Sequence, residues 1–300
     1  MRLHGIIPVL VSPMHEDGSP DHEGYHRLLD HIYEHPVGGL WVLGSASEDF
    51  LMSFEHRVEI TKLVSEHLAG KSKLVIGSAF PTLDQTWRFF DETADMAIDG
   101  YHLLPGDRKM KESMAYRYVK MIADRAPKPI WLYNNEKRAL KIQVPVVRDL
   151  KDHPNIDGIK AAGYDLADIV PFCVMADDNF QVIGSGGGHL MVFLGLGSQA
   201  HTASTASSYP GPYCKAFDLW EAGKIAEARE VAFGLSRLVK AMPHPENTEF
   251  AAEEKTVLEL LGICKRHVHP PFVPCTEAEV EQARAALEAH GLLPAAAAAT

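Results

Sequence analysis

Short apolar segments alternate with amphipathic segments along most of the 300-residue chain. Most of the apolar segments are continuously apolar rather than alternating, which is typical of strands buried on both faces of a parallel sheet. We count eight of them: GIIPVLVS from Gly5, GLWVLGS from Gly39, KLVIGSA from Lys73, GYHLLPG from Gly100, PIWLYNN from Pro129, IDGIKAA from Ile156, FQVIGS from Phe180 and GSQAHTA from Gly197. The pattern therefore predicts eight buried parallel strands.

The segments between these runs have the periodicity of helices. After Asp21, which can cap a helix, apolar residues recur with the i, i+3, i+4, i+7 spacing of one buried stripe. Thr82 and Gln85 have the spacing of a capping box, ahead of a second such stripe. Further helical patterns begin near Glu55, Glu112, Val144, Asp165, Gly188 and Pro212. A helix is thus expected after each strand.

Eight uninterrupted β–α units fit either a closed barrel or an open, doubly wound sheet. The number of strands favours a (β/α)8 TIM barrel, since eight strands close around an interior that side chains fill. We expect the barrel over residues 1–223. Three helical patterns without intervening strands predict a C-terminal helical appendage over 224–293, with helices near 224–242, 249–261 and 276–290. The alanine-rich residues 294–300 are expected to be a disordered tail.

Composition limits the classes of binding partner and the cellular compartment that we expect for this protein. A net charge of -11 opposes binding to nucleic acid or to anionic membranes. No apolar stretch reaches the ~18 residues of a membrane span, and the N-terminus lacks the features of a signal peptide. The four cysteines form no CxxC motif, so we expect reduced thiols in a cytoplasmic protein. The pairs His22/His26 and His31/His35 have zinc-ligand spacing but are interpreted as solvated helix faces.

Reactive side chains follow three of the predicted strands, at the end where barrels build their active sites. They lie in the segment 44–48, in Tyr133-Asn134-Asn135, and at Lys160 within the sixth run. A lysine that faces the barrel interior loses hydration, which lowers its pKa toward neutrality. A neutral amine can attack a ketone and form an iminium. The alternative is a lysine held in the barrel core by a structural ion pair with a carboxylate.

Several motifs occur together over nearly the whole chain. They are GIIPVLVSPMHEDGSPD at the start, the G-[ST]-x-x-E loop at 44–48, LMSFEHR after it, YNNEKR from Tyr133, GIKAAGYDL from Gly158, GSGGG from Gly184, and the ending with LELLG, HPPFVP and EVEQARAALEAHGLL. With these motifs the chain resembles the dihydrodipicolinate synthase / N-acetylneuraminate lyase family of class I, pyruvate-dependent aldolases. The pairing of the YN and GIK motifs is the most specific part of this resemblance.

The resemblance implies roles for three catalytic residues. Lys160 would form the Schiff base with the C2 ketone of pyruvate or a related 2-oxo acid. Tyr133 would move protons to and from the carbinolamine and the substrate oxygen, which suits a phenol because it both donates and accepts. Ser45 stands where the family has the hydroxyl that relays protons to this tyrosine. A simple turn residue is the alternative for Ser45.

Substrate contacts implied by the resemblance lie in the loops around these residues. The amides of Ser45 and Ala46 would hold the pyruvate carboxylate. The family usually has a second hydroxyl where this chain has Ala46, and the Ser47 hydroxyl could take its place. Arg138 would bind a carboxylate of the second substrate, and a plain surface arginine is the alternative. Gly184 would let the backbone approach the keto acid, although loops at this place in barrels also bind phosphate. These residues are joined by Gln199 and His201 on the eighth predicted strand.

The chain departs from the family pattern near the second substrate. The fourth-strand loop lacks the usual tyrosine and reads Pro105-Gly106-Asp107-Arg108, and Asn135-Glu136-Lys137 follows Tyr133 without the usual proline. His201, where small residues are common, is either an acid–base group or a core histidine with a satisfied hydrogen bond. These changes predict an acceptor or donor unlike that of dihydrodipicolinate synthase itself.

The predicted function is a Schiff-base lyase that joins or cleaves a 2-oxo acid and an aldehyde. Two alternatives remain open: a dehydratase or hydratase of a sugar-derived 2-oxo acid that uses the same lysine, and a non-catalytic protein that binds keto acids. The resemblance implies neither a metal nor an organic cofactor, because the iminium on Lys160 is the electron sink. It also implies a homo-oligomer, a tetramer or a dimer.

Overall fold

The computed structural model describes residues 1–162, 165–244 and 250–293. The predicted tail at 294–300 and the expected start of the second C-terminal helix at Glu249 lie outside these residues. The strands are β1(Gly5–Pro8), β2(Gly39–Val42), β3(Lys73–Gly77), β4(Gly100–Leu103), β5(Ile130–Asn134), β6(Ile156–Ala161), β7(Gln181–Ser185) and β8(Ala200–Ala203). Each of the eight predicted runs contains one of them.

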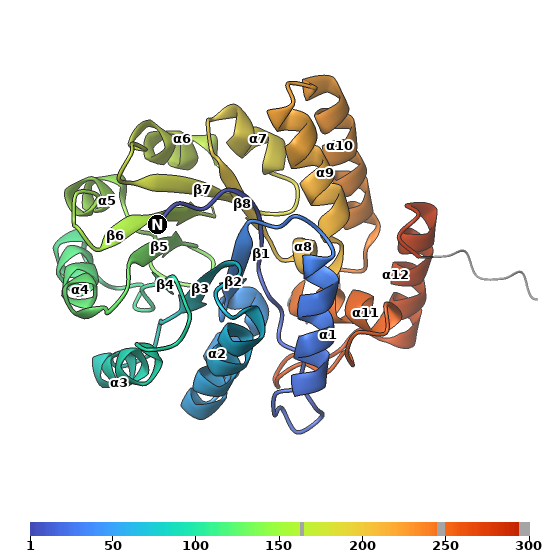
Figure 1. Cartoon of the computed structure of the whole chain (residues 1–300), viewed down its shortest axis with the longest axis horizontal. Helices are drawn as coiled ribbons and strands as arrows, with labels where there is room; N and C mark the ends of the chain where they lie inside the picture. The colour runs from blue at the N-terminus through green and yellow to red at the C-terminus, as the bar shows by residue number, and fades with distance from the viewer. Residues whose placement is uncertain (163–164, 245–249, 294–300) are drawn as a thin grey trace, which may run out of the picture.

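Helices follow the strands in the predicted alternation. They are α1(His22–Tyr33), the 3-10 turns η1(Ser45–Ser47) and η2(Asp49–Leu51), α2(Phe54–Leu68), α3(Leu83–Thr93), α4(Glu112–Arg125), α5(Val144–Leu150), α6(Leu166–Val174), α7(Leu190–Gly195), α8(Thr205–Ser208), α9(Pro210–Glu221), α10(Ile225–Ala241), α11(Phe250–Leu260) and α12(Glu277–Ala289). Figure 1 shows helices α1 to α9 around the sheet, with α10, α11 and α12 on one side.

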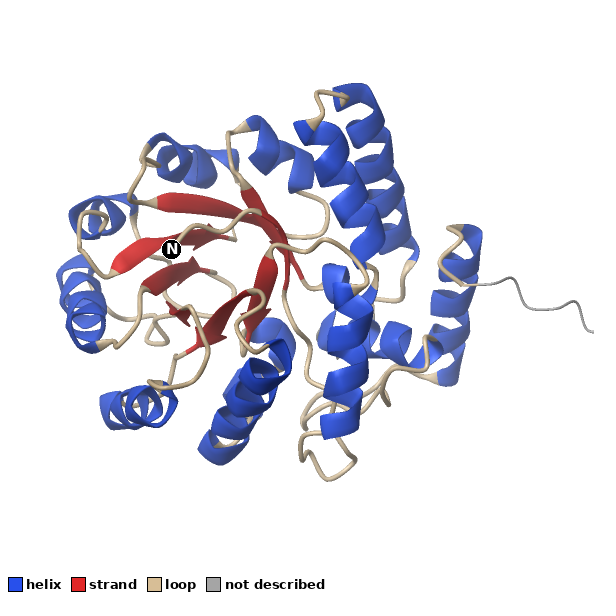
Figure 2. Cartoon of the chain, in the orientation of Figure 1, coloured by secondary structure: helices blue, strands red, loops and turns tan. Residues whose placement is uncertain are grey.

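The sheet confirms the barrel. Its strands are all parallel and follow the order β1-β8-β7-β6-β5-β4-β3-β2. The ring closes between β1 and β2, where Val9 forms a parallel bridge with Trp41 and the Leu10 amide donates to the Trp41 carbonyl. Figure 2 shows the strands at the centre and the helices outside, so the barrel interior and the strand–helix layer are both buried. All eight C-terminal strand ends therefore meet at one face.

Local sequence explains where the helices begin. The Asp21 side chain accepts a hydrogen bond from the Gly24 amide and so caps α1, whose predicted apolar stripe is buried. Thr82 caps α3 by accepting from the Gln85 amide. Thr276 and Glu279 form the predicted capping box at the start of α12.

Some boundaries differ from the sequence-based expectation. The first apolar run continues past Pro8, where β1 ends, and the next two residues connect the sheet edges: the Val9 amide donates to the Ala203 carbonyl of β8, and the Leu10 amide donates to the Trp41 carbonyl of β2. The helix expected near Pro212 is divided into α8 and α9 around Tyr209 and Pro210, and proline is favoured at such a first helical position. The eighth strand begins at Ala200 rather than at Gly197, which moves Gln199 to the N-terminal end of β8.

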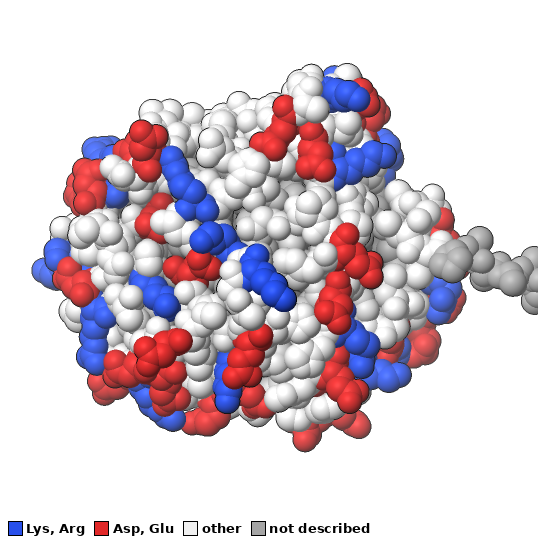
Figure 3. Space-filling model, viewed as in Figure 1, with Lys and Arg blue, Asp and Glu red and all other residues white. Residues whose placement is uncertain are grey.

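Charged side chains cover the surface without segregating by sign on the face in view. Figure 3 shows lysine and arginine interspersed with aspartate and glutamate among uncharged residues, so this face has no continuous basic surface for a polyanion. Within the described residues, no helix is both long enough and apolar enough to cross a membrane.

Candidate active site

Lys160 lies inside the barrel near the C-terminal end of β6. Its side chain is only 2% exposed, and β6 pairs Lys160 with Tyr133 of β5 and with Ile183 of β7. The Nζ atom lies 4.3 Å from the centre of the Tyr133 ring and 4.8 Å from that of Trp41. Burial lowers the pKa of Lys160 to about 7, and no carboxylate among the described residues offsets this shift. The geometry therefore lacks the structural ion pair that was the alternative for this residue.

Tyr133 and Ser45 meet beside Lys160. The Tyr133 hydroxyl accepts a hydrogen bond from the Asn135 side-chain amide at 3.0 Å. Burial raises the pKa of Tyr133, while its hydrogen bonds with Asn135 and Ser45 act in the opposite direction. The phenol is thus neutral near pH 7 and linked to a hydroxyl and an amide. Asn135 was not predicted as a partner of this hydroxyl, although it lies two residues beyond Tyr133.

The loop after β2 folds into the tight turn η1, which contains Ser45, Ala46 and Ser47. The Ser47 amide donates to the Gly44 carbonyl, and the Ser47 hydroxyl donates to the Leu10 carbonyl at 2.5 Å. All three residues of the turn are buried. The Ser47 hydroxyl is therefore directed to the backbone just after β1, and it affects the site through the shape of the turn.

A stacked pair, Trp41 and His102, flanks the lysine. Their rings lie 4.4 Å apart at 14°, and His102 Nε2 donates to the Val42 carbonyl at 3.0 Å. Burial lowers the pKa of His102 well below its usual value, and the Lys160 charge lowers it further. This pair was not among the predicted site residues, although a histidine inside the apolar run from Gly100 was a visible signal. Neutral rings here line the barrel interior without adding a second positive charge.

His201 occupies a comparable position on β8. It is fully buried, and its Nε2 donates to the Gly186 carbonyl at 2.8 Å. Burial lowers its pKa to about 4, with a smaller contribution from Lys160 in the same direction. Gly184 of β7 makes room for it, because a Cβ there would lie 2.4 Å from His201 Nδ1. His201 thus has the geometry of a core histidine with a hydrogen bond. The packing of its ring against the backbone explains the glycine at position 184.

A cavity of about 660 Å³ opens beside Ser45 at the same end of the barrel. Arg138, from the loop after β5, lines it and places its guanidinium 4.8 Å from the centre of the Phe50 ring. On its inner side, the buried Arg57 pairs with Asp49 at 3.7 Å. The cavity thus combines apolar walls with a cation at its edge.

Gln199 is not brought to this site. It is exposed and precedes β8, whereas Lys160 and Tyr133 lie near the opposite, C-terminal ends of their strands. Its position follows from the later start of β8. Gln199 therefore lies outside the site.

The histidine pairs of the first helix make separate contacts. His22 contacts Glu59 at 2.5 Å, and His26 contacts His67 at 2.8 Å. Among the described ranges, no group of three or more His, Cys, Asp or Glu residues is arranged to hold a metal ion.

Comparisons with known proteins agree with this architecture. The 4-hydroxy-tetrahydrodipicolinate synthase of Methanoculleus marisnigri is 27% identical over 292 residues, covering 96% of this chain and 99% of the relative. The solved dihydrodipicolinate synthase of Bacteroides thetaiotaomicron has a TM-score of 0.91 at 20% identity, covering 96% of this chain and all of that one. A catalytic-lysine mutant of the Ruminococcus gnavus sialic acid aldolase has a TM-score of 0.90 at 19% identity, covering 96% of each chain.

The two structural likenesses establish the shared barrel fold. The family model of the dihydrodipicolinate synthetase family matches residues 2–290, and this match over nearly the whole chain establishes the family. The chain therefore belongs to the dihydrodipicolinate synthetase family and is an aldolase-type lyase.

Proposed function

We propose that this enzyme joins or cleaves pyruvate, or a related 2-oxo acid, and an aldehyde through a Schiff base on Lys160. The observation that carries the proposal is a fully buried lysine whose pKa is lowered to about 7 with no carboxylate partner among the described residues. Such an amine is available as a nucleophile at neutral pH. The solved Ruminococcus gnavus sialic acid aldolase is a catalytic-lysine mutant, so that enzyme has a catalytic lysine, which supports the same role for Lys160.

The reaction begins when Lys160 Nζ adds to the C2 carbonyl of the keto acid and gives a carbinolamine. Loss of water forms the iminium, which draws electrons from C3 when a proton leaves or a carbon–carbon bond breaks. Tyr133 lies against the amine and supplies and removes the protons of these steps. Ser45, a partner of the Tyr133 hydroxyl, lines the cavity and connects the phenol to it, and Asn135 donates a hydrogen bond to the same hydroxyl.

Substrate recognition is assigned to the turn η1 and to the cavity. The amides of Ser45 and Ala46 hold the keto-acid carboxylate, as amides in such turns bind anions. Arg138 binds an anionic group on the aldehyde partner, since its guanidinium lines the cavity next to Ser45. Gly184 and His201 shape the opposite wall of the barrel interior.

Borohydride trapping tests the Schiff base. The enzyme is incubated with pyruvate and borohydride, with a known class I aldolase in parallel, and its peptides are analysed by mass spectrometry. We expect a reduced pyruvate adduct on the peptide that contains Lys160. The same adduct is expected in EDTA, because the iminium itself is the electron sink and no step is assigned to a metal. An adduct on another lysine, or none with any 2-oxo acid that the control aldolase accepts, would refute the proposal.

We also propose a homo-oligomer, a dimer or a tetramer, as the resemblance to the family implies. Sedimentation velocity of the purified chain measures this directly. A single species at the chain mass of 33.1 kDa across the working concentrations would contradict it.

A further inference from the structure

A buried ion pair joins the turn η1 to the C-terminal helix α11. Lys255 Nζ lies 2.5 Å from Glu48 Oε1, and both side chains have an exposed fraction of 0%. Glu48 Oε2 accepts a hydrogen bond from the His269 amide at 2.6 Å, and Lys255 donates a second one to the His267 carbonyl at 2.7 Å. Each charge is thus compensated by the other and by the backbone of the segment that follows α11.

Glu48 closes the turn that carries Ser45. Its amide donates to the Ser45 carbonyl, and its backbone has the left-handed conformation, with φ 59° and ψ 28°. A residue other than glycine pays a conformational cost in this region and persists there only when its surroundings hold it. The contacts of the Glu48 carboxylate with Lys255 and His269 are what hold it.

The other end of the same turn is fixed from inside the barrel. The Ser47 hydroxyl accepts from the Gly44 amide and donates to the Leu10 carbonyl. Ser45 and Ala46 therefore lie between two anchors, one at Leu10 in the segment after β1 and one on α11. Only the second anchor comes from outside the eight β–α units.

We propose that Lys255 is a positioning residue, which acts through Glu48 to hold the Ser45 and Ala46 amides in the geometry that binds the keto-acid carboxylate. The part of this inference that concerns the carboxylate rests on the proposed function. The anchoring of the turn does not, since it follows from contacts within the chain. The C-terminal helices would then help to set the geometry of the active site.

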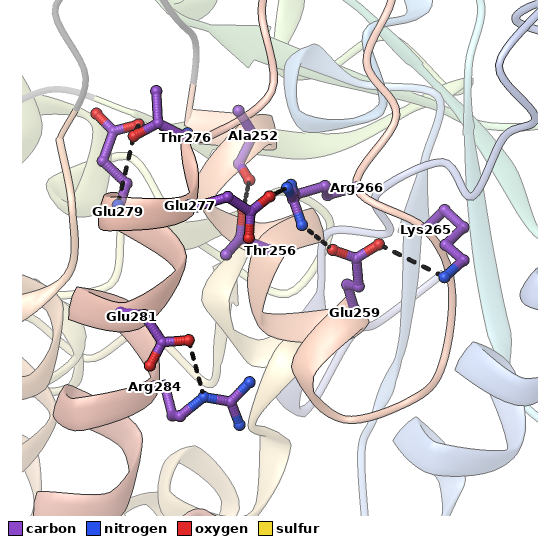
Figure 4. Close-up of polar contacts among 10 residues, drawn as sticks. All are labelled: Ala252, Thr256, Glu259, Lys265, Arg266, Thr276, Glu277, Glu279, Glu281 and Arg284. Carbon is purple, nitrogen blue, oxygen red and sulfur yellow. Dashed lines mark hydrogen bonds and ion pairs between the residues drawn. The ribbon is translucent and has the colours of Figure 1, made fainter.

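A second ion-pair network in the same region provides a matched control. Arg266 bridges Glu259 of α11 and Glu277 of α12, as Figure 4 shows. Removing Arg266 therefore weakens the C-terminal helices without removing a partner of Glu48. Lys255 pairs with Glu48 beside the turn η1, whereas Arg266 pairs with carboxylates of the C-terminal helices.

The variants must separate the loss of anchoring from the cost of a buried, unpaired charge. Lys255→Met leaves the Glu48 carboxylate uncompensated, which is strongly destabilising, whereas removing both charges of a buried pair is often close to neutral. The double variant Glu48→Gln with Lys255→Met contains no unpaired charge, and the glutamine oxygen can still accept from the His269 amide. Its stability is expected to return toward that of the wild type while the ionic anchor stays absent.

Hydrogen–deuterium exchange of the full-length enzyme, without substrate, tests the anchoring. We expect amides in the peptide spanning residues 44–52 to exchange about tenfold faster in the double variant than in the wild type. Arg266→Gln is expected to leave exchange in that peptide unchanged. Wild-type exchange in the double variant, or an equal increase in Arg266→Gln, would overturn the inference whether or not the enzyme uses pyruvate.

Steady-state kinetics test the link to the carboxylate. In the double variant we expect the KM for pyruvate to rise about tenfold while kcat changes by less than about threefold, because ground-state and transition-state binding are weakened together. If the double variant had both the KM and the melting temperature of the wild type, the role of Lys255 would be structural only. A wild type that forms no adduct with any 2-oxo acid would instead refute the proposed function, and the exchange result would still decide the anchoring.

Discussion

Replacing Lys160 by methionine is expected to lower kcat/KM by at least about 10⁴-fold and to abolish the borohydride-trapped adduct. Methionine fills a similar volume between Trp41 and Tyr133 but carries no nucleophile. The loss follows because every bond change in the proposed reaction passes through the iminium on this nitrogen. Steady-state kinetics and intact mass spectrometry measure the two effects on the same preparation.

The same substitution is expected to stabilise the fold, and the pH dependence of this gain has a definite sign. The folded enzyme releases the Lys160 proton near pH 7, whereas the unfolded chain keeps it up to the ordinary pKa of 10.5. Between these values the unfolded state binds more protons, so the free energy of unfolding of the wild type rises with pH. The advantage of Lys160→Met should therefore be a few kcal/mol at pH 7 and below, and should shrink toward pH 10. Urea denaturation at several pH values measures it.

Lys73→Met is the matched control for both measurements. Lys73 begins β3 at the opposite end of the barrel and pairs at the surface with Asp99. Its removal is expected to change neither the activity nor the pH dependence of stability noticeably, since exposed pairs contribute little. Activity of Lys160→Met within about tenfold of the wild type would exclude the Schiff base on this residue.

The strands were predictable because burial on both faces leaves a plain signal in sequence. Most runs were continuously apolar, and each contained a strand of four to six residues. Exact strand starts were not predictable, since an apolar or small residue fits both a strand and the loop before it. The three-residue difference at β8 was enough to misplace Gln199, because it decided which end of the barrel that side chain occupies.

The site itself was predictable only where one residue type carries the chemistry. Lys160 stood out as a charge inside an apolar run, and Tyr133 stood out through its motif. Lys255 gave no such signal, because a lysine in an amphipathic helix is usually solvated. Its partner Glu48 lies 207 positions away in sequence, so only the fold brings them together. The same holds for Trp41 and His102, whose stacking depends on the register of neighbouring strands.

Replacing Tyr133 by phenylalanine is expected to lower kcat by about 10²- to 10³-fold, the size of a lost acid–base group. The phenol is neutral at working pH because burial raises its pKa, so it can donate a proton to the leaving carbinolamine hydroxyl and recover one through the Ser45 hydroxyl, while the Asn135 amide holds the phenol oxygen. The pyruvate adduct should still form, but slowly, because Lys160 is retained. Borohydride trapping at a series of reaction times measures the rate of adduct formation, and steady-state kinetics measure kcat.

Tyr101→Phe distinguishes this loss from the general effect of removing a buried hydroxyl. Tyr101 is as deeply buried on β4, but its hydroxyl bonds to Thr93 of α3, on the outer side of the barrel. Its removal is expected to lower stability by about 1 kcal/mol and to leave kcat unchanged. If Tyr133→Phe kept more than a third of the wild-type kcat, the protons would have to move by another route. Ser45 would then be the group to replace next, because its hydroxyl is linked to the Tyr133 hydroxyl and can carry a proton.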